Sequence, residues 1–167
     1  RIISHGMNVA ILKRWIWFLN LFIQKLIIQA GAMNANYVME LKAVDLMNKT
    51  KQIWGRTFNL PVVFDCYDGE DVTAKQLIAL ENFIDMKNID DVVESVKKYC
   101  IEDKRNDNIR VIDNIFKYVV PKDIFVKRSE TEIVALMCNY KFDEEHGLSV
   151  VFKGGKLWKI GPQDIML

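Results

Sequence analysis

The residues most capable of chemistry form one short run, Asp143-Glu144-Glu145-His146-Gly147, which places three carboxylates beside an imidazole. A carboxylate next to a histidine can act as a general base or hold a metal ion, because His titrates near neutrality and Asp or Glu can orient its ring. The alternative is a polar turn, in which Gly147 takes a positive φ and hydrogen bonds of His146 hold the loop against a sheet. We favour the turn, because no nucleophile or second ligand lies nearby in the sequence.

A second acidic group surrounds Gly69. It lacks the alternating oxygen ligands and the closing Glu of a calcium loop, so a solvated turn is the simpler interpretation. Together, the two acidic groups could present a negative surface that steers a basic partner, such as a nuclease, into contact. We therefore predict a partner-binding surface made of Asp65, Asp68, Glu70, Asp71, Asp143, Glu144, Glu145 and His146.

Other chemical signatures are missing from the sequence. It has no Gly-rich phosphate loop, no Cys-x-x-Cys pair, no Gly-x-Ser-x-Gly elbow and no His-Glu-x-x-His motif. His5 and His146 are the only histidines, which excludes a two-His metal site within one domain. Cys66, Cys100 and Cys138 lie in apolar contexts typical of packed thiols, which fits a reducing cytoplasmic compartment. We expect no catalytic residue, no metal and no cofactor, and hence a protein that is not an enzyme.

The charge divides the chain into two parts. The 167 residues carry a net charge of +1, which argues against a dedicated nucleic-acid binder. Residues 1–36 contain four basic side chains and no acid, so residues 37–167 carry +1 − 4 = −3. Half of all residues are hydrophobic, enough to exclude an intrinsically disordered chain. We predict a basic apolar extension over residues 1–36 and a single domain over residues 37–167.

The extension is predicted to be helical over residues 9–28, which include Trp15 and Trp17. Its uncharged part, between Arg14 and Lys25, is shorter than the roughly 20 residues of a membrane span. Such a helix could lie in a membrane interface, act as a signal-like segment, or pack against the fold or a second copy of the chain. We favour packing against the fold or a second copy. We therefore expect that the chain can form a homo-oligomer through this helix, and we do not expect residues 9–28 to contact a membrane.

The first half of the domain shows strand and helix patterns. Residues 37–47 alternate imperfectly, and apolar residues at the even positions 58–64 predict a strand, which Pro61 would place at a sheet edge or break at its start. Thr73-Ala-Lys-Gln76 fits a capping box that begins a helix. Asn88 is expected to cap a second helix, and a third is predicted over residues 109–120, ended by Pro121.

The rest of the domain is predicted to form strands over residues 124–126, 133–140, 148–152 and 156–160. Gly154-Gly155 is typical of the turn between the last two. The predicted fold class is α+β, an antiparallel sheet with about three helices packed on it, preceded by the N-terminal apolar helix.

Two motifs carry a resemblance to a known family. Residues 139–152, Asn-Tyr-Lys-Phe-Asp-Glu-Glu-His-Gly-Leu-Ser-Val-Val-Phe, are followed by Gly161-Pro-Gln-Asp164. They resemble the C-terminal signature of an uncharacterised bacterial family, in which aromatic-Asp-x-Glu-His-Gly-Leu-x-Val precedes a hairpin and a Gly-x-Gln-Asp ending. Phe142 stands where that family is expected to have Trp. Trp54-Gly55, Asp68-Gly69 and Gln76 also match, so the resemblance spans residues 37–167.

The resemblance implies small, stand-alone bacterial proteins of unknown function, of a sort often found as immunity partners beside polymorphic or contact-dependent toxins. It brings no catalytic residues with it. Our leading hypothesis is therefore a cytoplasmic immunity protein of the toxin–antitoxin or contact-dependent inhibition kind, which neutralises a cognate toxin by direct protein binding. The alternatives are a metal- or ligand-binding domain or enzyme that uses Glu144, Glu145 and His146, and a membrane-surface protein anchored by its N-terminal helix.

Overall fold

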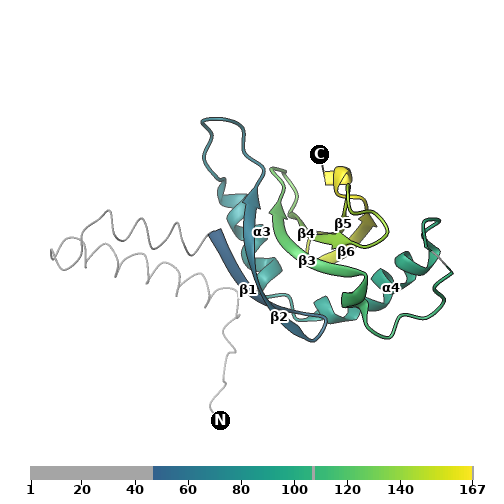
Figure 1. Ribbon diagram of the computed structural model, residues 1–167. Coiled ribbons are helices and arrows are strands. Elements are labelled where there is room, and N and C mark those ends of the chain that lie inside the picture. The colour runs from purple at the N-terminus through teal and green to yellow at the C-terminus, as the bar shows by residue number, and fades with distance from the viewer. Residues whose placement is uncertain (1–46, 107, 167) are drawn as a thin grey trace, which may run out of the picture. The chain divides into compact units, whose positions relative to one another are not determined.

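A six-stranded sheet forms the centre of the computed structural model, which describes residues 47–106 and 108–166 (Figure 1). These residues all fall within one unit, Asp45–Leu167. The predicted N-terminal helix and most of residues 37–47 lie outside the described residues. The strands follow each other across the sheet in sequence order. Their bounds are β1 Asn48–Ile53, β2 Arg56–Phe64, β3 Val119–Val126, β4 Ile133–Tyr140, β5 Leu148–Lys153 and β6 Lys156–Gly161.

The sheet is mixed, so the prediction of a purely antiparallel sheet is wrong. Residues 62–64 of β2 pair in parallel with residues 124–126 of β3, and the other neighbours pair antiparallel. A parallel pair needs a long crossover, and the segment between β2 and β3 contains both α-helices of the described chain. Pro61 lies where the ladder with β1 ends and the ladder with β3 begins, so β2 continues through it.

Two α-helices, α3 (Ala74–Ile84) and α4 (Val93–Glu102), are present in the described part of the chain. The capping box that begins α3 is confirmed, since Thr73 and Gln76 bond reciprocally. Asn88 does not cap α4, because it lies inside the 3₁₀ helix η1 (Asn88–Val92), which leads directly into α4.

The predicted third helix is wrong. Residues 109–120 contain only the short 3₁₀ helix η2 (Ile115–Lys117) before β3 begins at Val119. Val119 and Val120 pair with β4, where β-branched side chains pack well. Pro121 does not end a helix; it lies in β3, next to a register shift, the kind of position where a strand tolerates a missing N–H.

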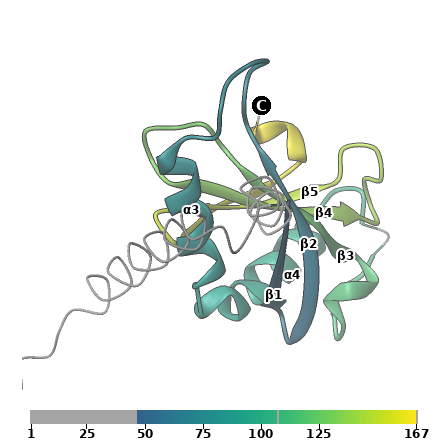
Figure 2. The same ribbon diagram turned by 90° about the vertical axis from the view of Figure 1, so that its left-hand side faces the viewer.

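Both helices pack on one face of the sheet, as Figures 1 and 2 show. Leu80 and Phe83 of α3 and Val96 and Cys100 of α4 meet the alternate residues of β4 that begin with Val134. The opposite face carries a smaller cluster covered by the C-terminal 3₁₀ helix η3 (Gln163–Met166). That cluster consists of Ile133, Ala135, Met137, Val151 and Met166, with Phe125 and Ile165 beside them.

Trp54 and Gly55 form the tight turn between β1 and β2, both at positive φ (51° and 81°). We expected one strand here, so this hairpin was missed. The segment between β2 and α3, which carries the first acidic group, projects beyond the end of the sheet (Figure 2). Among the described residues, no helix has the length and apolar character needed to cross a membrane.

Candidate functional site

The Asp143–Gly147 segment is a tight polar turn between β4 and β5, as favoured from the sequence. Gly147 has a φ of 61°, and its N–H donates to the carbonyl oxygen of Asp143 at 2.9 Å. The Asp143 carboxylate accepts hydrogen bonds from the backbone N–H of His146 at 3.1 Å and interacts with its imidazole Nδ1 at 3.0 Å. The turn is therefore held by its own acidic side chain.

Arg105 connects this turn to the end of α4. Its guanidinium bonds Asp143 and also Asp103, to which Nε lies 2.9 Å and Nη2 2.8 Å away. The hydroxyl of Tyr140 donates to the same Asp103 carboxylate at 2.9 Å. Asp103, Arg105, Tyr140, Asp143 and His146, which we call the Arg105 network, thus join the C-terminal end of α4 to both ends of the β4–β5 turn.

The electrostatics of the Arg105 network make its aspartates weak bases. Hydrogen bonds from Arg105 lower the pKa of Asp103 to about 2. The pKa of Asp143 is also lowered, chiefly by the backbone N–H of His146, and Asp143 in turn raises the pKa of His146. Charge-assisted hydrogen bonds favour the ionised carboxylates, so both serve to hold the turn in place.

Glu144 and Glu145 lie at the tip of the same turn and are exposed. Neither makes an ion pair or side-chain hydrogen bond with another described residue, so their charges face solvent. His146 is exposed beside them. Within residues 47–106 and 108–166, no group of three or more His, Cys, Asp or Glu side chains is arranged to hold a metal ion.

The first acidic group is attached to Arg128, in the turn between β3 and β4. The backbone N–H of Arg128 donates to the Asp65 carboxylate at 3.1 Å, and its guanidinium lies 3.0 Å from the Glu70 carboxylate. The same guanidinium donates to the backbone carbonyl of Asp71 at 3.3 Å. The carboxylates of Asp68 and Asp71 are exposed and free of ion pairs with other described side chains.

The structure does not bring the two acidic groups together. Asp65 bonds the end of β3 at Val126, which pairs with Val134 near the start of β4, whereas Asp143 follows Tyr140 at the end of β4. An eight-residue strand is roughly 25 Å long. The eight predicted partner-binding residues therefore form two separate patches, one at each end of β4.

The two motifs behind the family resemblance contact each other. The side chain of Gln163 donates to the carbonyl oxygen of Cys138 at 2.9 Å, and its backbone N–H donates to the carbonyl of His146 at 3.2 Å. Ser149 Oγ donates to the carbonyls of Gly161 and Pro162 at 3.3 and 3.2 Å. The Gly-Pro-Gln-Asp ending thus packs under the His-Gly turn.

Two of the three cysteines, Cys100 and Cys138, are packed thiols as predicted. Cys100 and Cys138 are buried and Cys66 is half-buried, and all three are free. Burial raises the pKa of Cys100 to about 11 and raises that of Cys138 as well. The thiols of Cys100 and Cys138 are thus kept protonated, unlike a nucleophilic cysteine.

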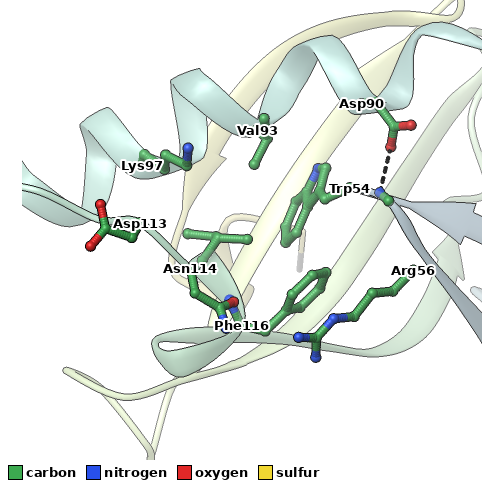
Figure 3. Close-up of a pocket in the computed structure, with 10 residues that line it drawn as sticks. Trp54, Arg56, Asp90, Val93, Lys97, Asp113, Asn114 and Phe116 are labelled. Atoms are coloured by element: carbon green, nitrogen blue, oxygen red, sulfur yellow. Dashed lines mark hydrogen bonds between the residues drawn. The ribbon is translucent and has the colours of Figure 1, made fainter.

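A pocket that sequence reasoning missed lies between the β1–β2 turn, α4 and η2 (Figure 3). Its volume is about 400 Å³. It is lined by Trp54, Gly55, Arg56, Asp90, Val93, Lys97, Asp113, Asn114, Ile115 and Phe116, and we call it the Trp54 pocket. The Trp-Gly-Arg sequence of the turn was the one available signal, because Trp is unusual in a two-residue hairpin loop.

Aromatic side chains form the inner wall of the Trp54 pocket. The indole of Trp54 lies 6.0 Å from the Phe116 ring between centroids and is only 8% exposed. The guanidinium of exposed Arg56 lies 4.3 Å from the centre of the Phe116 ring, within the range of a cation–π contact. The pocket thus combines apolar rings with a cation at its rim.

Comparison with known proteins identifies one family. The family model described as a domain of unknown function, DUF6985, matches residues 38–167. No curated protein and no solved structure matches the chain.

Proposed function

The chain belongs to the DUF6985 family, whose function is unknown, and we propose that it is a bacterial immunity protein that neutralises a cognate toxin by direct binding. In this proposal it acts in the cytoplasm as a binding protein and not as an enzyme. Its main contact is the β4–β5 turn, and its partner presents a basic surface.

The observation that carries the proposal is the way the β4–β5 turn is built. Asp143 is clamped by Arg105 and His146, so the turn is ordered before any partner arrives. Glu144 and Glu145 then project two exposed charges from a fixed backbone. Preorganised groups lose less conformational entropy on binding, and unpaired rim charges accelerate association with an opposite charge.

The patch around Asp68 and Asp71 is a second contact in this proposal. It is fixed in the same manner, because Arg128 bonds to Asp65 and Glu70 while the carboxylates of Asp68 and Asp71 stay exposed. A standard interface buries about 800 Å² on each partner, an area that extends over tens of ångströms. A toxin domain that meets the β4–β5 turn can reach the other patch only if it spans β4.

Co-expression of the chain with a toxin domain encoded beside its gene, followed by calorimetry on the purified pair, tests the proposal. The variant Glu144→Gln/Glu145→Gln removes two exposed charges and leaves Asp143 and its contacts intact. It should weaken binding about tenfold at low salt, and the loss should shrink as salt screens the charges.

The matched control is Glu81→Gln/Asp91→Asn, which removes the same charge from exposed positions on α3 and η1. It should change the affinity less than about twofold, because exposed charges far from the proposed contact contribute little to binding. Absence of a complex with every neighbouring toxin, or equal affinity for both double variants, would reject the proposal.

A further inference from the structure

We infer that the Trp54 pocket is a second binding site, separate from the acidic turns, for a carboxylate attached to an apolar group. The carboxylate would bind to Arg56 and the apolar group would lie against Trp54 and Phe116. This goes beyond the proposed toxin contact, because it involves the opposite charge and another part of the fold.

Trp54 departs from two local rules at once. Its φ of 51° belongs to the left-handed region, where a turn of this type favours Asn or Gly. Its Nε1–H is buried and is the one buried side-chain polar atom without a hydrogen-bond partner among the described residues. Such departures concentrate at functional sites, where the residue type is selected for binding and not for stability.

Arg56 supplies the charge that would select a carboxylate. The other lining cation, Lys97, is already bonded to Glu94 at 2.7 Å. Arg56 stacks on Phe116 and has no acidic partner among the described residues, so the N–H edge of its guanidinium stays available. A stacked guanidinium presents a planar fork that matches a carboxylate with two parallel hydrogen bonds.

The acidic side chains of the pocket do not cancel this charge. Asp90 accepts the backbone N–H of Gly55 at 3.3 Å, so part of its charge is compensated within the turn. Asp113 lies on the Lys97 side, away from Arg56, as Figure 3 shows. The Arg56 end of the pocket is therefore its positive end. Asp113 repels an anion bound there only from a distance.

The size of the pocket restricts the ligand. A volume of about 400 Å³ lies at the low end of ligand sites, which occupy about 300–1,000 Å³. It suits one ring with a short acidic arm. Such a group can come from a small aromatic acid or from a protein segment that has an acidic residue beside an aromatic one.

Binding of 3-phenylpropionate and of its neutral amide, 3-phenylpropanamide, tests the inference on the full chain. The Nε1–H signal of Trp54, assigned by its loss in Trp54→Phe, should shift with the acid. Arg56→Gln should weaken binding of the acid about tenfold and leave binding of the amide unchanged, because only the acid uses the guanidinium.

Two further variants separate this effect from a general loss of charge. Lys156→Gln removes a cation from the start of β6 and should change binding of the acid less than twofold. Asp113→Asn should tighten binding of the acid about twofold, because it removes a repelling charge. Circular dichroism should show the Arg56, Asp113 and Lys156 variants folded, since these three side chains are exposed.

The peptide acetyl-Phe-Glu-amide gives the second arm. Arg56-dependent binding of the peptide alone identifies a protein segment as the ligand, and Arg56-dependent binding of 3-phenylpropionate alone identifies a small acid. Either result supports a carboxylate site. Measurable and equal binding of the acid and the amide, or no binding of either the acid or the peptide, overturns it. Neither outcome affects the toxin test, which depends on Glu144 and Glu145.

Discussion

The side chain of Gln163 occupies the space where Gly147 would carry a β carbon, and from there it donates a hydrogen bond to the carbonyl of Cys138. A β carbon on Gly147 would also lie 2.8 Å from that carbonyl oxygen. The glycine of the His-Gly turn and the glutamine of the Gly-Pro-Gln-Asp ending thus require each other. The two motifs form one structural unit that holds the acidic turn.

Gly147→Ala should be far more destabilising than Gly69→Ala. Both glycines have positive φ, which costs a side chain about 1–2 kcal/mol, but only Gly147 meets neighbouring atoms. The clash should displace Gln163 and its hydrogen bond, for a total of about 3–5 kcal/mol. Urea denaturation of the two variants measures this difference, and similar losses for both would contradict the account.

Lys51→Met should destabilise the fold by about 2–4 kcal/mol, because a charged donor is lost from two carbonyls. The ammonium of this lysine, which is 5% exposed, donates to the carbonyls of Ile84 and Met86 at 2.9 Å each, at the end of α3. Burial lowers its pKa. Thermal unfolding checks the loss, with exposed Lys156→Met expected to stay within about 0.5 kcal/mol.

The imidazole of His146 should titrate above its usual pKa of about 6.5, because Asp143 stabilises the charged ring. Its contribution to stability is then fully present below about pH 6.5 and is lost as the pH rises through the raised pKa. Proton NMR of the ring gives the value directly. Asp143→Asn should return it toward 6.5, and Glu145→Gln should lower it less, since Asp143 is the larger cause.

Tyr140→Phe should raise the pKa of Asp103 from about 2, because the phenol hydroxyl donates to that carboxylate at 2.9 Å. Asp103 stabilises the fold above its ordinary pKa of about 3.9, and this contribution is lost as the pH falls toward 2. The variant should therefore lose about 1–2 kcal/mol at neutral pH and unfold at higher pH in acid. Tyr99→Phe, whose hydroxyl has no such bond to Asp103, is the control for acid denaturation.

Local signals predicted much of the fold. The capping box at Thr73, the Gly154-Gly155 turn and the strands of the C-terminal half could be predicted because each depends on residues that are close in sequence. The same holds for the polar turn at Gly147, where the residue types alone indicate a positive φ.

The errors arise where distant residues decide. Apolar residues at 109, 112 and 115 have the spacing of a helix. However, the side chain of Asn106 donates to the carbonyl of Ile109 and accepts from its backbone N–H, and Val119 pairs with Tyr140 of β4. The parallel pairing of β2 with β3 cannot be recognised in the sequence of either strand alone. The Trp54 pocket escaped notice because Trp54 and Phe116 meet only through the tertiary fold.

Amide hydrogen exchange of the chain, alone and bound to the toxin domain encoded beside its gene, tests the central claim most directly. The claim that the chain acts by docking its preformed β4–β5 turn predicts slower exchange at residues 141–147 on binding, with smaller changes along α4. Protection confined to other segments, with the exchange of residues 141–147 unchanged in a formed complex, would contradict it.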